Sequence, residues 1–80
     1  MPFAKTEADW EARASAFLKA ELRKAGVTYA ELVKRMKKHG FKDETEASIT
    51  NKLKRGKFNA TFFLAALVAI GLEVVKLEDI

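Results

Sequence analysis

The chain has 80 residues with a formal charge of +4, 49% hydrophobic residues, a single histidine and no cysteine. A chain of this length buries about 60–65% of its unfolded surface, which is enough for one core and predicts a single domain over residues 1–80. The absence of cysteine excludes disulfides and thiolate metal sites. With His39 as the single histidine, a metal site built from several histidines or a catalytic triad is not expected. The modest positive charge permits an anionic partner without requiring one.

The first predicted helix covers about residues 7–25. Thr6, followed three residues later by Asp9, is typical of a helix cap, and Gly26 supplies a left-handed stop. Apolar residues recur at helical spacing from Trp10 onwards and form one stripe, with charged residues on the opposite side. We expect Trp10 to anchor this helix in the core.

A second helix is predicted over about residues 28–39. Thr28 can accept a hydrogen bond from the amide of Glu31, and the Glu31 side chain can reach back to complete a capping box. The inward face is apolar and consists of Leu32, Val33 and Met36. The opposite face is basic and carries Lys34, Lys37 and Lys38.

The third predicted helix covers about residues 45–55. Its start can be capped in two ways, by Asp43 with Glu46 or by Thr45 with Ser48. Ile49 and Leu53 lie four residues apart and define the buried edge, so at about 100° per residue Asn51 points away from the core. The outward face is small, polar and basic, and its other members are Ala47, Ser48, Lys54 and Arg55.

The fourth predicted helix covers about residues 60–70 and follows an Asn59 cap. Phe58 before the cap and Phe63 within the helix can form a hydrophobic staple. The helix is apolar on almost all sides, so we expect it to be central and covered by the others. Its longest apolar run has nine residues, about half of a membrane span. The N-terminal segment does not resemble a signal peptide, so we expect a cytoplasmic protein without membrane contact.

The tail, residues 72–80, is consistent with either a short strand or a terminal turn. The elements together predict an all-α fold, a compact bundle of four to five helices with a short C-terminal strand as an option. An exposed apolar tail on a small domain often contacts a partner. We therefore expect a homodimer with contacts through Leu72, Val74, Val75 and Leu77.

Few residues offer catalytic chemistry. Acidic residues gather at the predicted starts of the first and third helices, where the helix dipole favours them without any acid/base role. The sequence contains neither GxxxxGK[ST] nor GxGxxG, the glycine-rich motifs that bind phosphates. We therefore expect no enzyme activity, no cofactor, no metal and no small-molecule ligand.

The positive charge is concentrated in the middle of the chain. Residues 1–33 have no net charge, residues 34–58 carry nine basic and three acidic side chains, and residues 59–80 have a net charge of −2. A concentrated basic segment is typical of a nucleic-acid binder, and a solvated lysine-rich surface is the alternative interpretation.

The basic second helix and the polar face of the third helix are typical of a helix-turn-helix, in which one helix crosses the DNA backbone and the next enters the major groove. Asn51 and Arg55 suit adenine and guanine edges. The base-reading candidates are Ala47, Ser48, Asn51 and Arg55. The phosphate-binding candidates are lysines and helix starts, namely Thr28, Tyr29, Lys34, Lys37, Lys38, Thr45, Lys52, Lys54 and Lys57. For Tyr29, packing in the core is an equal alternative.

Several pieces of sequence carry a family resemblance: LRKAGVT leading into AELV, KRGK at the end of the third helix, and the following FFLAALVAIGL. Over about residues 17–75 the chain resembles the phage-repressor-like (Cro-type, xenobiotic-response-element-type) helix-turn-helix. It is also similar to short uncharacterised bacterial proteins, catalogued as a domain of unknown function, that share ITNKLKRGKF and FFLAAL. The connection HGFKDETEAS is longer than the usual tight turn. The resemblance implies a lambda-repressor-like fold and a regulator that binds duplex DNA, commonly as a dimer.

The sequence therefore predicts sequence-specific binding of duplex DNA by a small bacterial transcriptional regulator, with the third helix in the major groove. The alternative is a helical protein–protein interaction module, antitoxin-like or an adaptor, that keeps the scaffold without reading DNA. Retention on duplex DNA at low salt distinguishes these two functions, because lysine–phosphate contacts release counterions and are strongest there.

Overall fold

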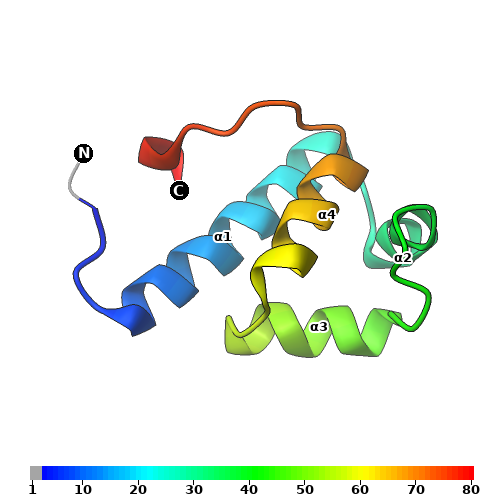
Figure 1. Ribbon diagram of the computed structural model, residues 1–80, viewed down its shortest axis with the longest axis horizontal. Helices are drawn as coiled ribbons and strands as arrows, with labels where there is room; N and C mark the ends of the chain where they lie inside the picture. The colour runs from blue at the N-terminus through cyan, green and yellow to red at the C-terminus, as the bar shows by residue number, and fades with distance from the viewer. Residues whose placement is uncertain (1–2) are drawn as a thin grey trace.

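The computed structural model describes residues 3–80, and all of its secondary-structure elements are helices (Figure 1). In chain order these are α1 (Glu7–Ala25), α2 (Tyr29–Lys37), α3 (Glu46–Arg55), α4 (Ala60–Ile70) and a short 3₁₀ helix, η1 (Leu77–Asp79). Residues 3–80 contain no strand, so the tail forms a terminal turn and the predicted all-helical fold is confirmed.

Local capping chemistry determines where the helices begin. Thr6, Thr28 and Asn59 each accept a hydrogen bond from the amide three residues later, as predicted. At α3 the second of the two predicted caps is observed, because Thr45 and Ser48 bond reciprocally. The box predicted at α2 is only half formed, since the Glu31 carboxylate bonds to Arg35 instead of reaching back.

The α2 helix is shorter than predicted and ends at Lys37 instead of residue 39. Residues 38–40 form a turn, and the amide of Phe41 bonds to the carbonyl of Met36. The connection to α3 consequently has eight residues, 38–45, none of which is helical. A connection of this length needs contacts of its own to fix the orientation of the helix that follows it.

Two pairs of helices make up the bundle. The α4 helix packs against α1 and α2, and α3 packs against the same two helices. In Figure 1, α1 and α4 run alongside each other through the middle of the molecule, α3 lies along the lower edge, and α2 is seen nearly end-on at the right. The tail returns from the end of α4 over α1. One long face of α3 is therefore left without a covering element.

Phe62 of α4 is the largest fully buried side chain of the core. The ring of Phe41 meets it edge-on with a centroid distance of 6.3 Å, and the ring of Phe58 lies at 5.4 Å. Phe58 also stacks on Phe63 at 5.8 Å, which confirms the predicted staple. The other large side chains that are fully buried come from the three other helices and are Leu18, Leu32, Met36, Ile49 and Leu53.

Two predictions about the core are wrong. Trp10 is not a core anchor, because it is 43% exposed and stacks on Phe3. The first turns of the 19-residue α1 contact the end of α3 on the side of Glu11, and this contact leaves Trp10 at the surface. The α4 helix is not covered on all sides either, since Leu64 and Val68 are 60% and 55% exposed. The α1 and α2 helices cover two of its sides and leave a third to solvent.

The end of α3 is fastened to α1 by two close contacts. The buried Ser15 hydroxyl of α1 donates a hydrogen bond to the carbonyl of Leu53. Gly56, which ends α3 with φ +68°, lies so close that a Cβ atom built on it would be 3.0 Å from the carbonyl oxygen of Glu11. Neither contact has a signal in the local sequence pattern, because each joins residues far apart in the chain.

Gly56→Ala is expected to destabilise the fold more than Gly26→Ala. Both glycines have φ +68°, where an L residue costs about 1–2 kcal/mol, but a Cβ on Gly26 would meet no atom within 4 Å. The contact with α1 should add about 1–3 kcal/mol for Gly56 alone. Urea unfolding monitored by circular dichroism measures how much each variant lowers the free energy of unfolding relative to the wild type. Equal losses of stability in the two variants would show that the backbone at Glu11 can move away from the added Cβ atom at little cost.

Candidate functional site

The outward face of α3 is exposed to solvent at most of the positions that the sequence predicted. Ile49 and Leu53 point into the core and are 0% and 1% exposed. Asn51, predicted to point the opposite way, is exposed. Three further candidates on this face are exposed as well, namely Ala47, Lys54 and Arg55. The structure therefore brings four of the predicted residues together on one side of one helix.

Ser48, the remaining base-reading candidate, is occupied by the start of α3. Its Oγ accepts a hydrogen bond from the amide of Thr45 at 2.8 Å and lies 2.6 Å from Oε1 of Glu44, to which it donates. Thr45, predicted as a phosphate ligand, in turn caps α3 by accepting from the Ser48 amide. The side chain of Ser48 is half-buried. Its hydroxyl therefore stabilises the helix start instead of facing solvent freely.

Lys52 also differs from the other lysines of the segment. Its ammonium group forms an ion pair with the Glu44 carboxylate and lies 4.4 Å from the centroid of the buried Phe62 ring. An ammonium over an aromatic face is attracted by the ring quadrupole. The structure thus places Lys52 on the flank of α3 that turns towards the core.

Most of the remaining basic side chains of residues 34–58 are exposed around α2 and α3. They comprise all the other predicted lysines together with Lys42 and Arg55, that is Lys34, Lys37, Lys38, Lys42, Lys54, Arg55 and Lys57. Lys42, which is not among the predicted phosphate-binding residues, is exposed in the connection between α2 and α3. Arg35 differs from these residues because its guanidinium is held within the protein, with Nε bonded to Glu31 at 3.0 Å and Nη1 to the carbonyl of Ala69 at 3.1 Å.

The start of α2 contains the two remaining candidates. The Thr28 hydroxyl accepts from the Glu31 amide at 3.1 Å, and the residue itself is exposed. Tyr29 is half-buried and packs against the hydrophobic core. Of the two interpretations offered for Tyr29, packing is therefore the one observed.

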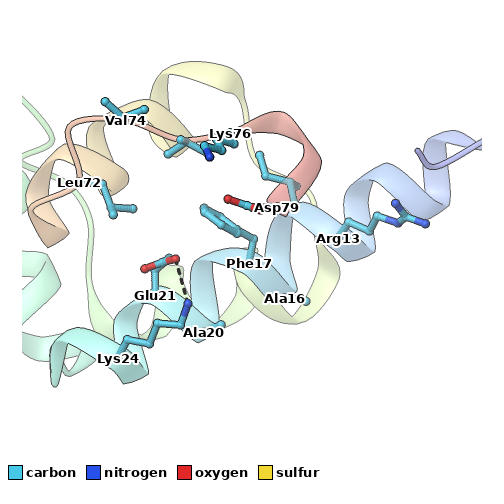
Figure 2. Close-up of a pocket in the computed structure, with 12 residues that line it drawn as sticks. Arg13, Ala16, Phe17, Ala20, Glu21, Lys24, Leu72, Val74, Lys76 and Asp79 are labelled. Carbon is cyan, nitrogen blue, oxygen red and sulfur yellow. Dashed lines mark ion pairs between the residues drawn. The ribbon is translucent and has the colours of Figure 1, made fainter. Parts of the chain in front are cut away.

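The four tail residues predicted to meet a second copy divide into two pairs. Leu72 and Val75 are half-buried against the chain's own core, while Val74 and Leu77 are 78% and 69% exposed. Figure 2 shows Leu72 pointing from the tail towards α1 and Val74 pointing away from it. Between the tail and α1 lies a groove of about 810 Å³ with Phe17 in its wall. None of the residues predicted to bind DNA lines this groove.

Two further features bear on function. Among residues 3–80, no group of three or more histidine and carboxylate side chains is arranged to hold a metal ion. Over the same residues, no helix has both the length and the apolar character needed to cross a bilayer.

Glu44 is the functional candidate that sequence reasoning missed. It contacts Ser48 and Lys52, four and eight residues further along, and the second of these contacts depends on how the loop meets the helix. A capping pattern can indicate the first contact, whereas no periodicity indicates the second. Arg35 was likewise counted only as part of the basic segment, because its contact with Ala69 joins different helices.

Comparison with curated proteins and with solved structures finds no match. A protein-family model described as "Domain of unknown function (DUF6471)" matches residues 10–75. This span includes the whole of α2, α3 and α4 and most of α1. It also confirms the predicted similarity to a domain of unknown function over about residues 17–75. The chain therefore belongs to the DUF6471 family.

Proposed function

We propose that this protein binds duplex DNA sequence-specifically, as a small cytoplasmic transcriptional regulator of the phage-repressor-like helix-turn-helix type. The observation that carries the proposal is the outward face of α3, where exposed small, amide and basic side chains lie opposite a fully buried apolar edge. An α-helix with its side chains is about 10–12 Å across, and the major groove of B-DNA is about 12 Å wide. A helix exposed along one long face can enter such a groove.

The chemistry of this face suits base edges. Asn51 can form two hydrogen bonds with adenine, and Arg55 can form two with guanine, each pair contributing about 1–3 kcal/mol of discrimination. The methyl group of Ala47 suits the methyl group of thymine. Asn51 and Arg55 lie four residues apart and therefore share a face of α3. In this proposal Ser48 supports the helix start and contributes little to base reading.

In this proposal the exposed lysines around α3 bind the DNA phosphates. Lys34, Lys37 and Lys38 lie in the second half of α2 and just beyond it, and Lys54 and Lys57 lie at the end of α3 and beyond it. Lysines on both helices would hold the backbone on either side of the groove. Lys42, in the connection between α2 and α3, joins this group.

A second candidate function is a protein–protein interaction module, which is favoured by the apolar surface of α4. This helix contains no charged residue, and Leu64 and Val68 are exposed four residues apart on it. Exposed apolar surface of this kind marks contact sites between proteins. The exposed tail residues Val74 and Leu77 support the related proposal that the regulator forms a homodimer.

Binding of wild-type protein to duplex DNA should be strong at low salt and fall as salt is added. Each phosphate neutralised by a lysine contributes a slope of about −0.9 to log affinity against log salt. Fluorescence anisotropy with a labelled duplex, titrated at several salt concentrations, measures this slope. Absence of any binding at low salt would exclude DNA as the partner and favour the interaction module.

Substitutions should separate base reading from phosphate binding once a preferred duplex has been selected from a random pool. Asn51→Ala and Arg55→Ala should each reduce the preference for that duplex over a scrambled one by about 1–3 kcal/mol. Lys38→Ala, the matched control, should weaken binding to both duplexes alike. Identical behaviour of all three variants would show that α3 is not the reading element.

The homodimer should depend on the exposed side of the tail. Sedimentation equilibrium at high micromolar concentration should give a dimeric mass for the wild type and a monomeric mass for the double variant Val74→Glu with Leu77→Glu, because the apolar contact is replaced by like charges. Lys76→Glu changes the charge of the tail without removing an apolar side chain and should remain dimeric. A monomeric wild type under these conditions would contradict the dimer.

A further inference from the structure

The eight-residue connection between α2 and α3 raises the question of what orients α3. A helix-turn-helix normally joins its two helices by a turn of about 3–4 residues, which leaves the second helix little freedom. Residues 38–45 are twice that length and contain no helical turn that continues into α3. The end of α3 is fastened to α1, and the orientation of its start must therefore come from other contacts.

We propose that Glu44 is the positioning residue of α3 and that Lys52 is its internal anchor, not a phosphate ligand. This inference rests on the proposed function, because α3 is the helix assigned to base reading there. Both residues act through the helix and touch no base themselves.

The first supporting observation is that both carboxylate oxygens of Glu44 are engaged by α3. Oε1 accepts a hydrogen bond from Ser48 Oγ at 2.6 Å, and Oε2 pairs with the ammonium of Lys52. The Glu44 side chain is only 9% exposed. Ser48 and Lys52 lie four residues apart and share a face of the helix, so a single carboxylate holds the first two turns of α3.

The second observation is that this cluster is attached to the core. Lys52 Nζ lies 4.4 Å from the centroid of Phe62, which is 1% exposed. In the middle of the connection, the ring of Phe41 makes a T-shaped contact with the same ring. The connection is therefore linked at two points to one buried side chain, directly by the apolar contact of Phe41 and indirectly by Glu44, which pairs with Lys52.

These contacts also decide the electrostatic role of Lys52. Its charge is compensated by Glu44 within the protein, so a phosphate that approached it would compete with a largely buried carboxylate. Removing one partner of such a pair leaves the other charge poorly solvated and allows α3 to shift. Paired hydrogen bonds to bases weaken steeply with misalignment. The loss should therefore appear in sequence discrimination more than in general affinity for DNA.

The test compares Glu44→Gln with Glu46→Gln, each assayed with the selected and the scrambled duplex. Both variants remove one negative charge near the start of α3, but Glu46 is exposed. Glu44→Gln should lower the ratio of the two affinities about tenfold, whereas Glu46→Gln should leave the ratio within about twofold. Equal ratios for the two variants would overturn the role of Glu44.

Lys52 is tested by the salt dependence of binding. Lys52→Met keeps an apolar chain over Phe62 and should leave the slope of log affinity against log salt unchanged. Lys54→Met should reduce the magnitude of that slope by about 0.9. Lys52→Arg retains a cation for both Glu44 and the ring and should preserve the affinity ratio. A slope for Lys52→Met that falls as far as that for Lys54→Met would show that Lys52 binds phosphate.

Amide hydrogen exchange of the free protein separates this inference from the proposed function. Exchange at residues 41–48 should quicken about tenfold in Glu44→Gln and not in Glu46→Gln, since the loss of the anchor permits local opening. If the wild type binds no duplex, the proposed function fails, and exchange alone then decides whether Glu44 positions α3. Unchanged exchange in Glu44→Gln would overturn the inference in either case.

Discussion

The aromatic ring of Phe62 is the point at which the parts of this small fold converge. It contacts the ring of Phe41 from the connection, the ring of Phe58 from the segment before α4, and the ammonium group of Lys52 from α3. A bundle of four short helices has little area with which to fix their mutual orientation. Because three segments contact the one buried ring, the non-helical connection between α2 and α3 is held against the core.

The helix starts could be predicted because the interactions that determine them are local. Thr6, Thr28 and Asn59 are followed by the amides that they cap, and no other part of the chain is needed. Thr45 with Ser48 was one of two options, and the structure decides between them. The outward direction of Asn51 was predictable for a similar reason, since helical spacing alone relates it to the buried edge of α3.

What could not be predicted depends on how helices meet. Trp10 is a large apolar residue at the helical spacing of the buried stripe, yet it is exposed. Whether such a residue is buried depends on how far the neighbouring helices extend, which the periodicity of its own helix does not reveal. Lys52 was placed with the phosphate candidates because it is basic and lies on α3, yet its neighbours Glu44 and Phe62 come from other segments. A count of charges along the chain therefore overstates the charge that the surface presents.

The two sides of α3 have separate tasks, and this separation has a consequence for how the protein could change. The side that holds the fold together comprises Ile49, Leu53 and Lys52, while Ala47 and Asn51 on the other side are exposed. Substitutions at exposed positions usually alter stability by no more than about 0.5 kcal/mol. The outward positions can thus be randomised together in a library without repacking the core, which makes this domain a compact scaffold for selecting new surface chemistries.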